Sequence, residues 1–169
     1  MSAMNTRILS IFGTAALLVS GFGSPAFGAD TTAATSRPAI YVEKADGAKQ
    51  IADALAVAKK ENKRVLLQFG ANWCGWCHKL HKLCQTDPDI AAKLRDSFVV
   101  VLVDVNKGHN GDINKKYGNP AGLGLPAIVI LDADGKALVT QDTGKLEEGD
   151  HHDPKKVLAF LNNWAGKKS

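Results

Sequence analysis

The sixteen residues FGANWCGWCHKLHKLC (Phe69–Cys84) decide how this chain folds. They hold all three cysteines, two of the three tryptophans and two of the five histidines. Cys74 and Cys77 form a C-x-x-C pair, which proteins use as a redox-active dithiol, as part of a metal site or, when a histidine follows, for haem attachment. The surrounding residues have to distinguish these uses.

Helical and strand patterns alternate on both sides of this stretch. Apolar residues recur at helical spacing between residues 47 and 62, after a candidate N-cap at Asp46. Residues 65–69 (VLLQF) and 97–105 (SFVVVLVDV) are short apolar runs that predict buried strands. Residues 113–118 (INKKYG) predict a short helical turn. This alternation is typical of an α/β protein.

Two further helix starts and a hairpin complete the pattern. Asp87 followed by Pro88, and Asp153 followed by Pro154, each predict an N-cap with a proline in the first helical turn. Residues 125–142 hold two strand-like runs around the turn DADG, which predicts a β-hairpin that adds antiparallel edge strands. We therefore expect a mixed central sheet with helices on both faces.

The cysteine pair falls where a buried strand ends and a helix begins. A helix N-terminus carries free N–H groups and a partial positive charge, which favour a thiolate over a thiol. We expect Cys74 to be the exposed nucleophile and Cys77, one turn into the helix, to be the shielded resolving thiol. Cysteines at this spacing can form a disulfide without backbone strain.

In these features the chain resembles the thioredoxin superfamily over residues 40–165. The matching stretches are VLLQFGANWCGWCHKL, VDVN and KKYGNPAGLGLPAIVILDADGKAL. The resemblance implies a thioredoxin-like fold and a thiol-disulfide oxidoreductase whose redox centre is the two cysteines, with no cofactor. It also implies that Pro126 is a cis proline facing the cysteines, beside which an extended substrate segment can pair. The residues expected to contact substrate are Trp73, Gly75, Trp76, Leu125 and Pro126.

One departure from the family pattern concerns the proton acceptor. The buried aspartate that many thioredoxins hold on the strand before the active site falls on Gln68 here. An amide cannot take up a proton, so the base for Cys77 must come from elsewhere. Asp104, His78 and water are the candidates.

Further departures affect the direction of electron flow. Gly75 and Trp76 stand between the cysteines in place of Gly-Pro, and Leu125 precedes the proline where Thr, Val or Ile is common. These positions tune the redox potential, so the sequence leaves the direction open. A mature chain of about 140 residues leaves little room for the extra domains of periplasmic disulfide oxidases and isomerases. We therefore favour a monomeric reductase that acts on protein disulfides or dithiols and exchanges electrons with a membrane protein.

A metal centre competes with redox chemistry as a use for this stretch. It contains five potential zinc or copper ligands: Cys74, Cys77, His78, His81 and Cys84. A single helix cannot turn all five toward one ion, and the sequence contains no second C-x-x-C. We predict no metal site, with copper or zinc handling by the fold kept as an alternative function, and we expect both histidines to face solvent or to be partly buried.

Haem attachment and non-enzymatic partner binding also compete with redox chemistry. CGWCH matches the C-x-x-C-H haem rule, but the chain has no methionine after Met4 to serve as an axial ligand, and the strand-rich pattern is wrong for a cytochrome c. A thioredoxin fold can also hold a partner at the Trp76 and Pro126 surface without turnover.

Several neighbouring residues have simpler expected roles. Cys84 lies two helical turns beyond Cys77, about 10 Å away, which is too far for a disulfide. We expect it to be a small buried hydrophobic residue. Trp73 is expected to wedge against the sheet, and Trp76 to be exposed and available to a partner. Residues 149–153 (GDHHD) are expected to form a polar loop that ends in a helix N-cap.

The N-terminus indicates export. Arg7 is the only charged residue before Asp30, and the apolar run 8–19 is too short to span a bilayer. We predict a signal peptide at residues 1–29, a flexible lead at 30–39, a thioredoxin-like domain at 40–166, and a periplasmic or secreted location without a stable membrane span. Removing the signal lowers the net charge from +4 to +3. The scattered basic residues do not indicate nucleic-acid binding.

Overall fold

A computed structural model describes residues 37–166 of the chain. The predicted signal peptide and most of the predicted lead lie outside the described residues. The four main strands are β1 (Arg64–Gly70), β2 (Phe98–Asp104), β3 (Ala127–Leu131) and β4 (Ala137–Asp142). The α-helices are α1 (Gly47–Glu61), α2 (Gly75–Thr86), α3 (Pro88–Ser97), α4 (Gly111–Lys116) and α5 (Pro154–Trp164). Between β4 and α5 lie a 3₁₀ turn (Thr143–Leu146) and the two-residue strands β5 (Glu147–Glu148) and β6 (His151–His152).

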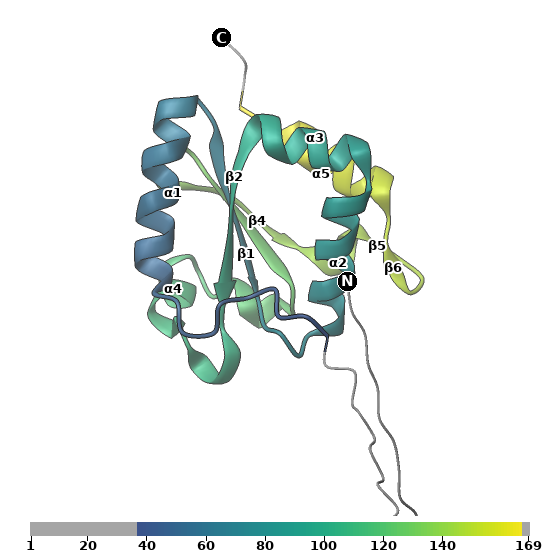
Figure 1. Cartoon of the computed structure of the whole chain (residues 1–169), viewed down its shortest axis with the longest axis horizontal. Helices are drawn as coiled ribbons and strands as arrows, with labels where there is room; N and C mark the ends of the chain where they lie inside the picture. The colour runs from purple at the N-terminus through teal and green to yellow at the C-terminus, as the bar shows by residue number, and fades with distance from the viewer. Residues whose placement is uncertain (1–36, 167–169) are drawn as a thin grey trace, which may run out of the picture. The chain divides into compact units, whose positions relative to one another are not determined.

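The main sheet has the order β2-β1-β3-β4. β1 is parallel to β2 and antiparallel to β3, and β3 is antiparallel to β4. Figure 1 shows α1 on one side of this sheet and α2, α3 and α5 on the other, so the predicted mixed sheet with helices on both faces is confirmed. The sheet belongs to a thioredoxin-like fold.

The hairpin differs in one respect from its prediction. Both of its strands are predicted at an edge, but β3 pairs with β1 in the interior and only β4 is at an edge. The burial of the strands agrees with this order, because all five residues of β3 are buried whereas β4 is half-buried or exposed. The second edge of the sheet is β2.

The predicted helix caps are confirmed. Asp46 accepts a hydrogen bond from the backbone N–H of Lys49 at 3.1 Å, and Asp153 accepts one from that of Lys156 at 2.8 Å. Asp87 ends α2 and also caps α3 by accepting from the N–H of Ile90 at 3.0 Å. Each cap satisfies a backbone donor that the first helical turn leaves without a partner.

Side chains of β1 alternate between the two faces of the sheet, as the strand period of two requires. Val65, Leu67 and Phe69 belong to the core beneath α1, whereas Leu66 belongs to the core beneath α2, α3 and α5. Gln68 and Gly70 therefore face α2, at the end of the strand where the cysteines lie.

The segment that precedes α1 is held against the active-site loop by hydrogen bonds to Asn72. Residues 37–46 contain no regular strand. The backbone N–H groups of Ile40 and Tyr41 donate to Asn72 Oδ1 at 2.9 and 2.8 Å, and Asn72 Nδ2 donates to the Tyr41 carbonyl at 3.0 Å. These bonds bring Tyr41 next to the cysteines. Within residues 37–166, no helix has the length and apolar character needed to cross a membrane.

Candidate active site

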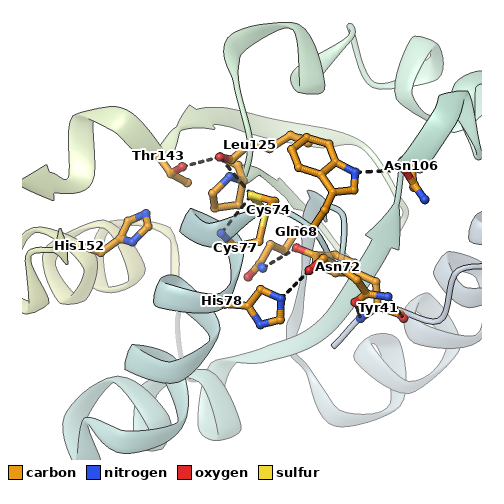
Figure 2. The surroundings of a disulfide bond; sticks show 12 residues. Tyr41, Gln68, Asn72, Cys74, Cys77, His78, Asn106, Leu125, Thr143 and His152 are labelled. Carbon is orange, nitrogen blue, oxygen red and sulfur yellow. Dashed lines mark hydrogen bonds between the residues drawn. A yellow bond between two sulfur atoms is a disulfide. The ribbon is translucent and has the colours of Figure 1, made fainter. Parts of the chain in front are cut away.

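Cys74 and Cys77 are joined by a disulfide at the start of α2 (Figure 2). Cys74 is the N-cap residue of the helix, and the backbone N–H of Cys77 donates to its sulfur at 3.1 Å. The loop Ala71–Trp73 carries the chain from the end of β1 to this cap. The sequence spacing thus places both sulfurs at the helix N-terminus, where a negative charge on Cys74 is stabilised.

The predicted exposure of Cys74 is wrong for the oxidised pair. Its side chain is 5% exposed, and that of Cys77 is fully buried. Ile40, Trp76 and Leu125 pack against the two cysteines and Tyr41. Cys74 is still the more exposed of the two residues.

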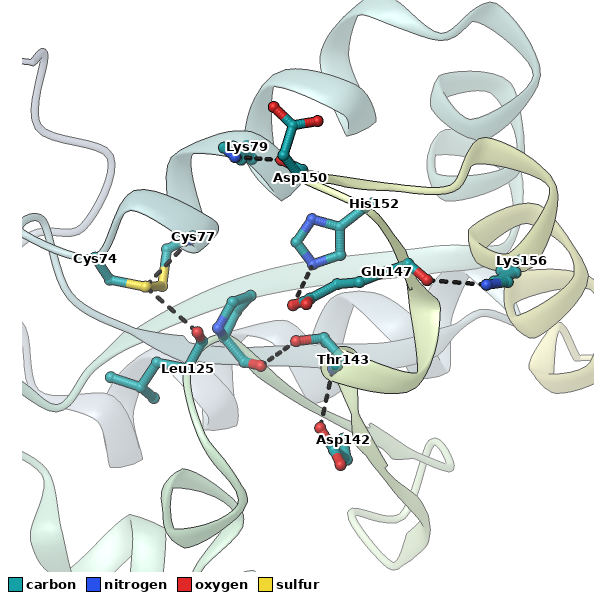
Figure 3. Close-up of polar contacts among 12 residues, drawn as sticks. Cys74, Cys77, Lys79, Leu125, Asp142, Thr143, Glu147, Asp150, His152 and Lys156 are labelled. Atoms are coloured by element: carbon teal, nitrogen blue, oxygen red, sulfur yellow. Dashed lines mark hydrogen bonds and ion pairs between the residues drawn. A yellow bond between two sulfur atoms is a disulfide. The ribbon is translucent and has the colours of Figure 1, made fainter.

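The Leu125–Pro126 segment faces the disulfide from across the site. Its peptide bond is cis, as the family resemblance implies. The Leu125 carbonyl oxygen lies 3.5 Å from Cys74 Sγ, and the Pro126 carbonyl accepts a hydrogen bond from the Thr143 hydroxyl (Figures 2 and 3). Thr143 is buried, and sequence reasoning missed it. It connects the proline to the turn that precedes β5.

Trp73 lies in a different environment from the predicted one, whereas Trp76 is less exposed than predicted. Trp73 does not wedge against the sheet, because it is 67% exposed and is held only at its edge, where Nε1 donates to Asn106 Oδ1 at 3.0 Å. Trp76 is half-buried: its ring meets that of His152 edge-on at 5.3 Å between centroids, and Lys79 Nζ lies 4.4 Å from its centre. The large exposed apolar surface beside the disulfide is therefore that of Trp73.

Gly75 lies between the cysteines and is half-buried. A Cβ added at this position would lie 3.3 Å from an Arg37 guanidinium nitrogen. Together with Trp73, Trp76, Leu125 and Pro126, Gly75 belongs to the group of residues that the structure brings around the disulfide.

The region predicted as a polar loop is partly ordered over α2. Asp153 caps α5 as predicted, but His152 lies on β6 and is only 3% exposed, so the prediction of a solvated loop is wrong for this residue. The β5–β6 pair folds His152 against Trp76, and Glu147 Oε1 approaches its Nε2 at 3.9 Å (Figure 3). Burial, followed by repulsion from Lys79, lowers the pKa of His152 to about 4.

Behind the disulfide, a tyrosine occupies the space that a glycine leaves. Gln68 is buried and donates through Nε2 to the Tyr41 hydroxyl at 2.7 Å. A Cβ added to Gly70 would lie 2.1 Å from the Tyr41 hydroxyl oxygen and 2.8 Å from Cys77 Sγ. Sequence reasoning missed Tyr41, and the only signal for it was a glycine in a buried strand.

Asp104 and His78, the two side chains predicted as candidate proton acceptors, have different surroundings in the structure. Asp104 is 2% exposed, and neither of its carboxylate oxygens has a well-formed hydrogen bond among residues 37–166. Burial raises the pKa of this carboxyl group. His78 is half-buried, as predicted, and its Nε2 donates to the Asn72 carbonyl at 2.7 Å. Its ring is thus already engaged with the active-site loop.

Cys84 is a free thiol on α2, away from the disulfide. It is half-buried and lines an apolar cavity of about 270 Å³ between the sheet and α2, α3 and α5. Burial, reinforced by Asp87, raises its pKa to about 12. Its apolar surroundings agree with the predicted role. Among the described residues, no three His, Cys, Asp or Glu side chains are grouped so that they could hold a metal ion.

Comparison with known proteins finds relatives that are named for thiol-disulfide exchange. "Thiol:disulfide interchange protein DsbD" of Vibrio vulnificus is 33% identical over 106 residues, which make up 63% of this chain and 18% of that protein. The chain therefore spans less than a fifth of the length of this relative. The C-terminal domain of DsbD from Neisseria meningitidis shares the fold, with a TM-score of 0.52 and 21% identity over 71% of this chain and 97% of that one.

A closer match in length is the crystal structure of a disulphide isomerase from Xylella fastidiosa. It is 34% identical, with a TM-score of 0.66 over 73% of this chain and 95% of that chain. A family model described as thioredoxin-like matches residues 47–133, which is more than half of the chain and includes both cysteines and Pro126. The chain therefore belongs to the thioredoxin-like family.

Proposed function

We propose that this protein is a thiol-disulfide oxidoreductase that exchanges electrons with disulfides and dithiols of other proteins. The observation that carries the proposal is the Cys74–Cys77 disulfide at the N-terminus of α2, beneath the cis peptide bond of Pro126. A relative named for thiol-disulfide interchange and a structural neighbour named as a disulphide isomerase support it.

In the reducing direction the two cysteines carry both electrons. The Cys74 thiolate attacks a substrate disulfide, forms a mixed disulfide and releases the first substrate sulfur as a thiolate. Cys77 then loses its proton and attacks Cys74 Sγ, so that the Cys74–Cys77 bond forms and the second substrate sulfur leaves. Two electrons pass from the protein to the substrate, and an external dithiol must supply two electrons to restore the starting state.

Five residues would form the substrate surface: Trp73, Gly75, Trp76, Leu125 and Pro126. Trp73 offers an exposed ring beside Cys74, and an extended substrate segment could lie against the Leu125–Pro126 backbone. A partner that displaces Leu125 from Cys74 would also open the path to the sulfur. Docking and exposure of the nucleophile are coupled in this scheme.

We further propose that the protein works outside the cytoplasm as a monomeric reductase supplied with electrons by a membrane protein. The predicted signal peptide supports this location, and the similarity to a protein named for thiol:disulfide interchange supports the exchange of electrons itself. An oxidising compartment contains no general source of electrons, so such a reductase needs a dedicated donor.

The reduction potential of the pair tests the direction. The protein without residues 1–29 is equilibrated in glutathione or dithiothreitol buffers, and the free cysteines are counted by alkylation and intact mass. A potential near that of thioredoxin, about −270 mV, agrees with a reductase, whereas one near about −120 mV would mean an oxidant.

A turnover assay tests the activity itself. Reduction of insulin disulfides is followed with dithiothreitol as electron donor, for the wild type and for Cys74→Ser, Cys77→Ser and Cys84→Ser. We expect the first two variants to lose turnover and Cys84→Ser to keep it. Turnover that persists in Cys74→Ser would contradict its role as nucleophile, and a wild type without turnover above the dithiothreitol background would leave a partner-binding module as the better description.

A further inference from the structure

The resolving step requires Cys77 to lose a proton in a buried site. Cys77 is fully buried, and the residue at the end of β1 that could take its proton in other thioredoxins is Gln68 here. An amide neither gains nor loses a proton at neutral pH. The proton must therefore leave by another route through this part of the structure.

The neighbouring strand supplies a carboxylate on the same face of the sheet. Gly70 of β1 and Asp104 of β2 are partners in the parallel register, and adjacent strands lie about 4.8 Å apart. Leu102 packs against the cysteine cluster, and Asp104, two residues further along β2, points to the same face. Asp104 therefore lies beside the place where Tyr41 and Cys77 meet.

The Tyr41 hydroxyl lies near Cys77 Sγ, and the charge of Asp104 acts on it. Its hydroxyl oxygen and Cys77 Sγ approach a single point above Gly70 at 2.1 and 2.8 Å, so the two atoms are within about 5 Å of each other. The oxygen accepts one hydrogen bond, from Gln68, which leaves a lone pair for a second donor. Within residues 37–166, the side-chain hydrogen bonds of Tyr41 in the oxidised form include none in which its hydroxyl donates.

The electrostatics suit a proton relay. Burial raises the pKa of Tyr41, so the phenol stays neutral, and Asp104 contributes to the same shift. Burial also raises the pKa of Asp104. Three neighbours modify this pKa: the Asn106 backbone N–H and the nearby His109 lower it, and Glu43 raises it. Because neither oxygen of Asp104 makes a well-formed hydrogen bond to a described residue, the carboxylate is free to accept a proton.

We propose that Asp104 accepts the proton of Cys77 through the hydroxyl of Tyr41, with Gln68 as a positioning residue that orients the phenol. This inference rests on the proposed oxidoreductase function. As the S–H proton of Cys77 passes to the Tyr41 oxygen, the Tyr41 O–H proton passes to Asp104. The Cys77 thiolate then attacks Cys74 Sγ, the substrate sulfur leaves with the bonding electron pair, and the proton on Asp104 is returned to that sulfur or to solvent.

The test uses Ellman's reagent, which reports the two thiol steps separately. Attack by Cys74 releases a first thionitrobenzoate, and attack by Cys77 on the resulting mixed disulfide releases a second. Both are followed at 412 nm by stopped flow from pH 5 to pH 9, in a Cys84→Ser background so that only the pair reacts. The rate of the second release measures deprotonation and attack by Cys77.

Three variants distinguish the relay from a general effect of charge or packing. Asp104→Asn removes the acceptor, and Tyr41→Phe removes the hydroxyl but keeps the buried ring. We expect both to slow the second release by a factor on the order of 10² near neutral pH and to shift its pH inflection upward, with the first release unchanged. Glu43→Gln removes a nearby negative charge that raises the pKa of Asp104 but lies outside the path, so it should slow the second release far less than either of these variants.

The outcomes are separable. A wild type without a second release would refute the proposed function itself. A second release whose rate and pH profile are the same in the wild type and in Asp104→Asn would overturn only the relay. If Asp104→Asn does not fold, Tyr41→Phe decides the matter, because that variant lacks the hydroxyl of the proposed path and an unaltered pH profile in it would overturn the relay. An equal effect of Glu43→Gln would also overturn the relay, since it would show that charge alone is responsible.

Discussion

Replacing Gly70 with alanine tests whether Tyr41 fills the space behind the disulfide. The added Cβ would lie 2.1 Å from the Tyr41 hydroxyl oxygen, 2.6 Å from its Cζ and 2.8 Å from Cys77 Sγ. Tyr41 is 2% exposed, and Cys77 is fully buried and held by the disulfide. Neither side chain can move without opening the cluster of Tyr41, Cys74 and Cys77. The new methyl group must therefore push residues 37–46 away from β1.

The size of the effect follows from this crowding. Overpacking a core destabilises a protein by about 1–3 kcal/mol. Because both neighbouring side chains are constrained, we expect Gly70→Ala to lose about 3 kcal/mol of the free energy of unfolding, the upper end of this range. The described part of the chain has about 130 residues. For a domain of this size, such a loss lowers the melting temperature by about 10 °C.

Urea unfolding of the oxidised protein, followed by tryptophan fluorescence, measures this loss. Gly111→Ala is the matched control, because a Cβ at that position in α4 meets no described residue within 4 Å apart from its chain neighbours and the backbone of its own helix. This control should be unchanged or more stable by up to about 1 kcal/mol.

A double-mutant cycle with Tyr41→Ala makes the test specific. Removing a buried aromatic side chain from the wild type destabilises it by about 3–5 kcal/mol. The same change should have a smaller effect in the Gly70→Ala background, by about 1 kcal/mol or more, because it removes the clash. Equal urea midpoints for Gly70→Ala and Gly111→Ala, or strictly additive effects in the cycle, would refute the placement of Tyr41.

Three further predictions concern residues around the disulfide. Trp73→Ala should change the free energy of unfolding by no more than about 0.5 kcal/mol, because the ring is exposed, yet it should raise the KM for a protein substrate; an unchanged KM would remove Trp73 from the substrate surface. Burial lowers the pKa of His152 to about 4, from 6.5 in the unfolded chain, so the unfolded state binds more protons between these values. The contribution of neutral His152 is present above pH 6.5 and is lost as the pH falls toward 4, so the wild type should lose about 2 kcal/mol more than His152→Gln between pH 7 and pH 5; parallel stability profiles from urea unfolding would contradict this. Burial raises the pKa of Cys84 to about 12, so at pH 8 iodoacetamide should alkylate it about 10³-fold more slowly in the folded protein than in urea; rapid labelling of the native protein by mass spectrometry would show that the thiol is accessible.

Features that depend on nearby residues could be predicted from the sequence. The caps at Asp46, Asp87 and Asp153 follow from side chains that bond to backbone groups two or three residues away. The strand that ends before Cys74 follows from a continuous apolar run, and the disulfide from a spacing of three residues at a helix start. The resemblance to thioredoxins added the cis peptide bond at Pro126.

Features that depend on contacts between distant segments could not be predicted from the sequence. Tyr41 reaches Gln68 across 27 positions of the chain, and nothing near Tyr41 in the sequence indicates a buried role. The prediction that Trp73 wedges against the sheet is wrong, and Trp76 is less exposed than predicted because His152 from the β5–β6 pair packs against it. The exposure of a side chain depends on which other segment packs against it.

The sequence by itself therefore determined the type of reaction centre, since local spacing at a helix start is enough to bring Cys74 and Cys77 together. Only the tertiary structure decided which groups surround that centre. Gly70 admits Tyr41, and the parallel register of β1 and β2 sets Asp104 beside it without a well-formed hydrogen bond to its carboxylate from the described residues. The physical reason is that burial and proton affinity arise from all the segments packed around a group, whereas a C-x-x-C disulfide needs only one turn of helix.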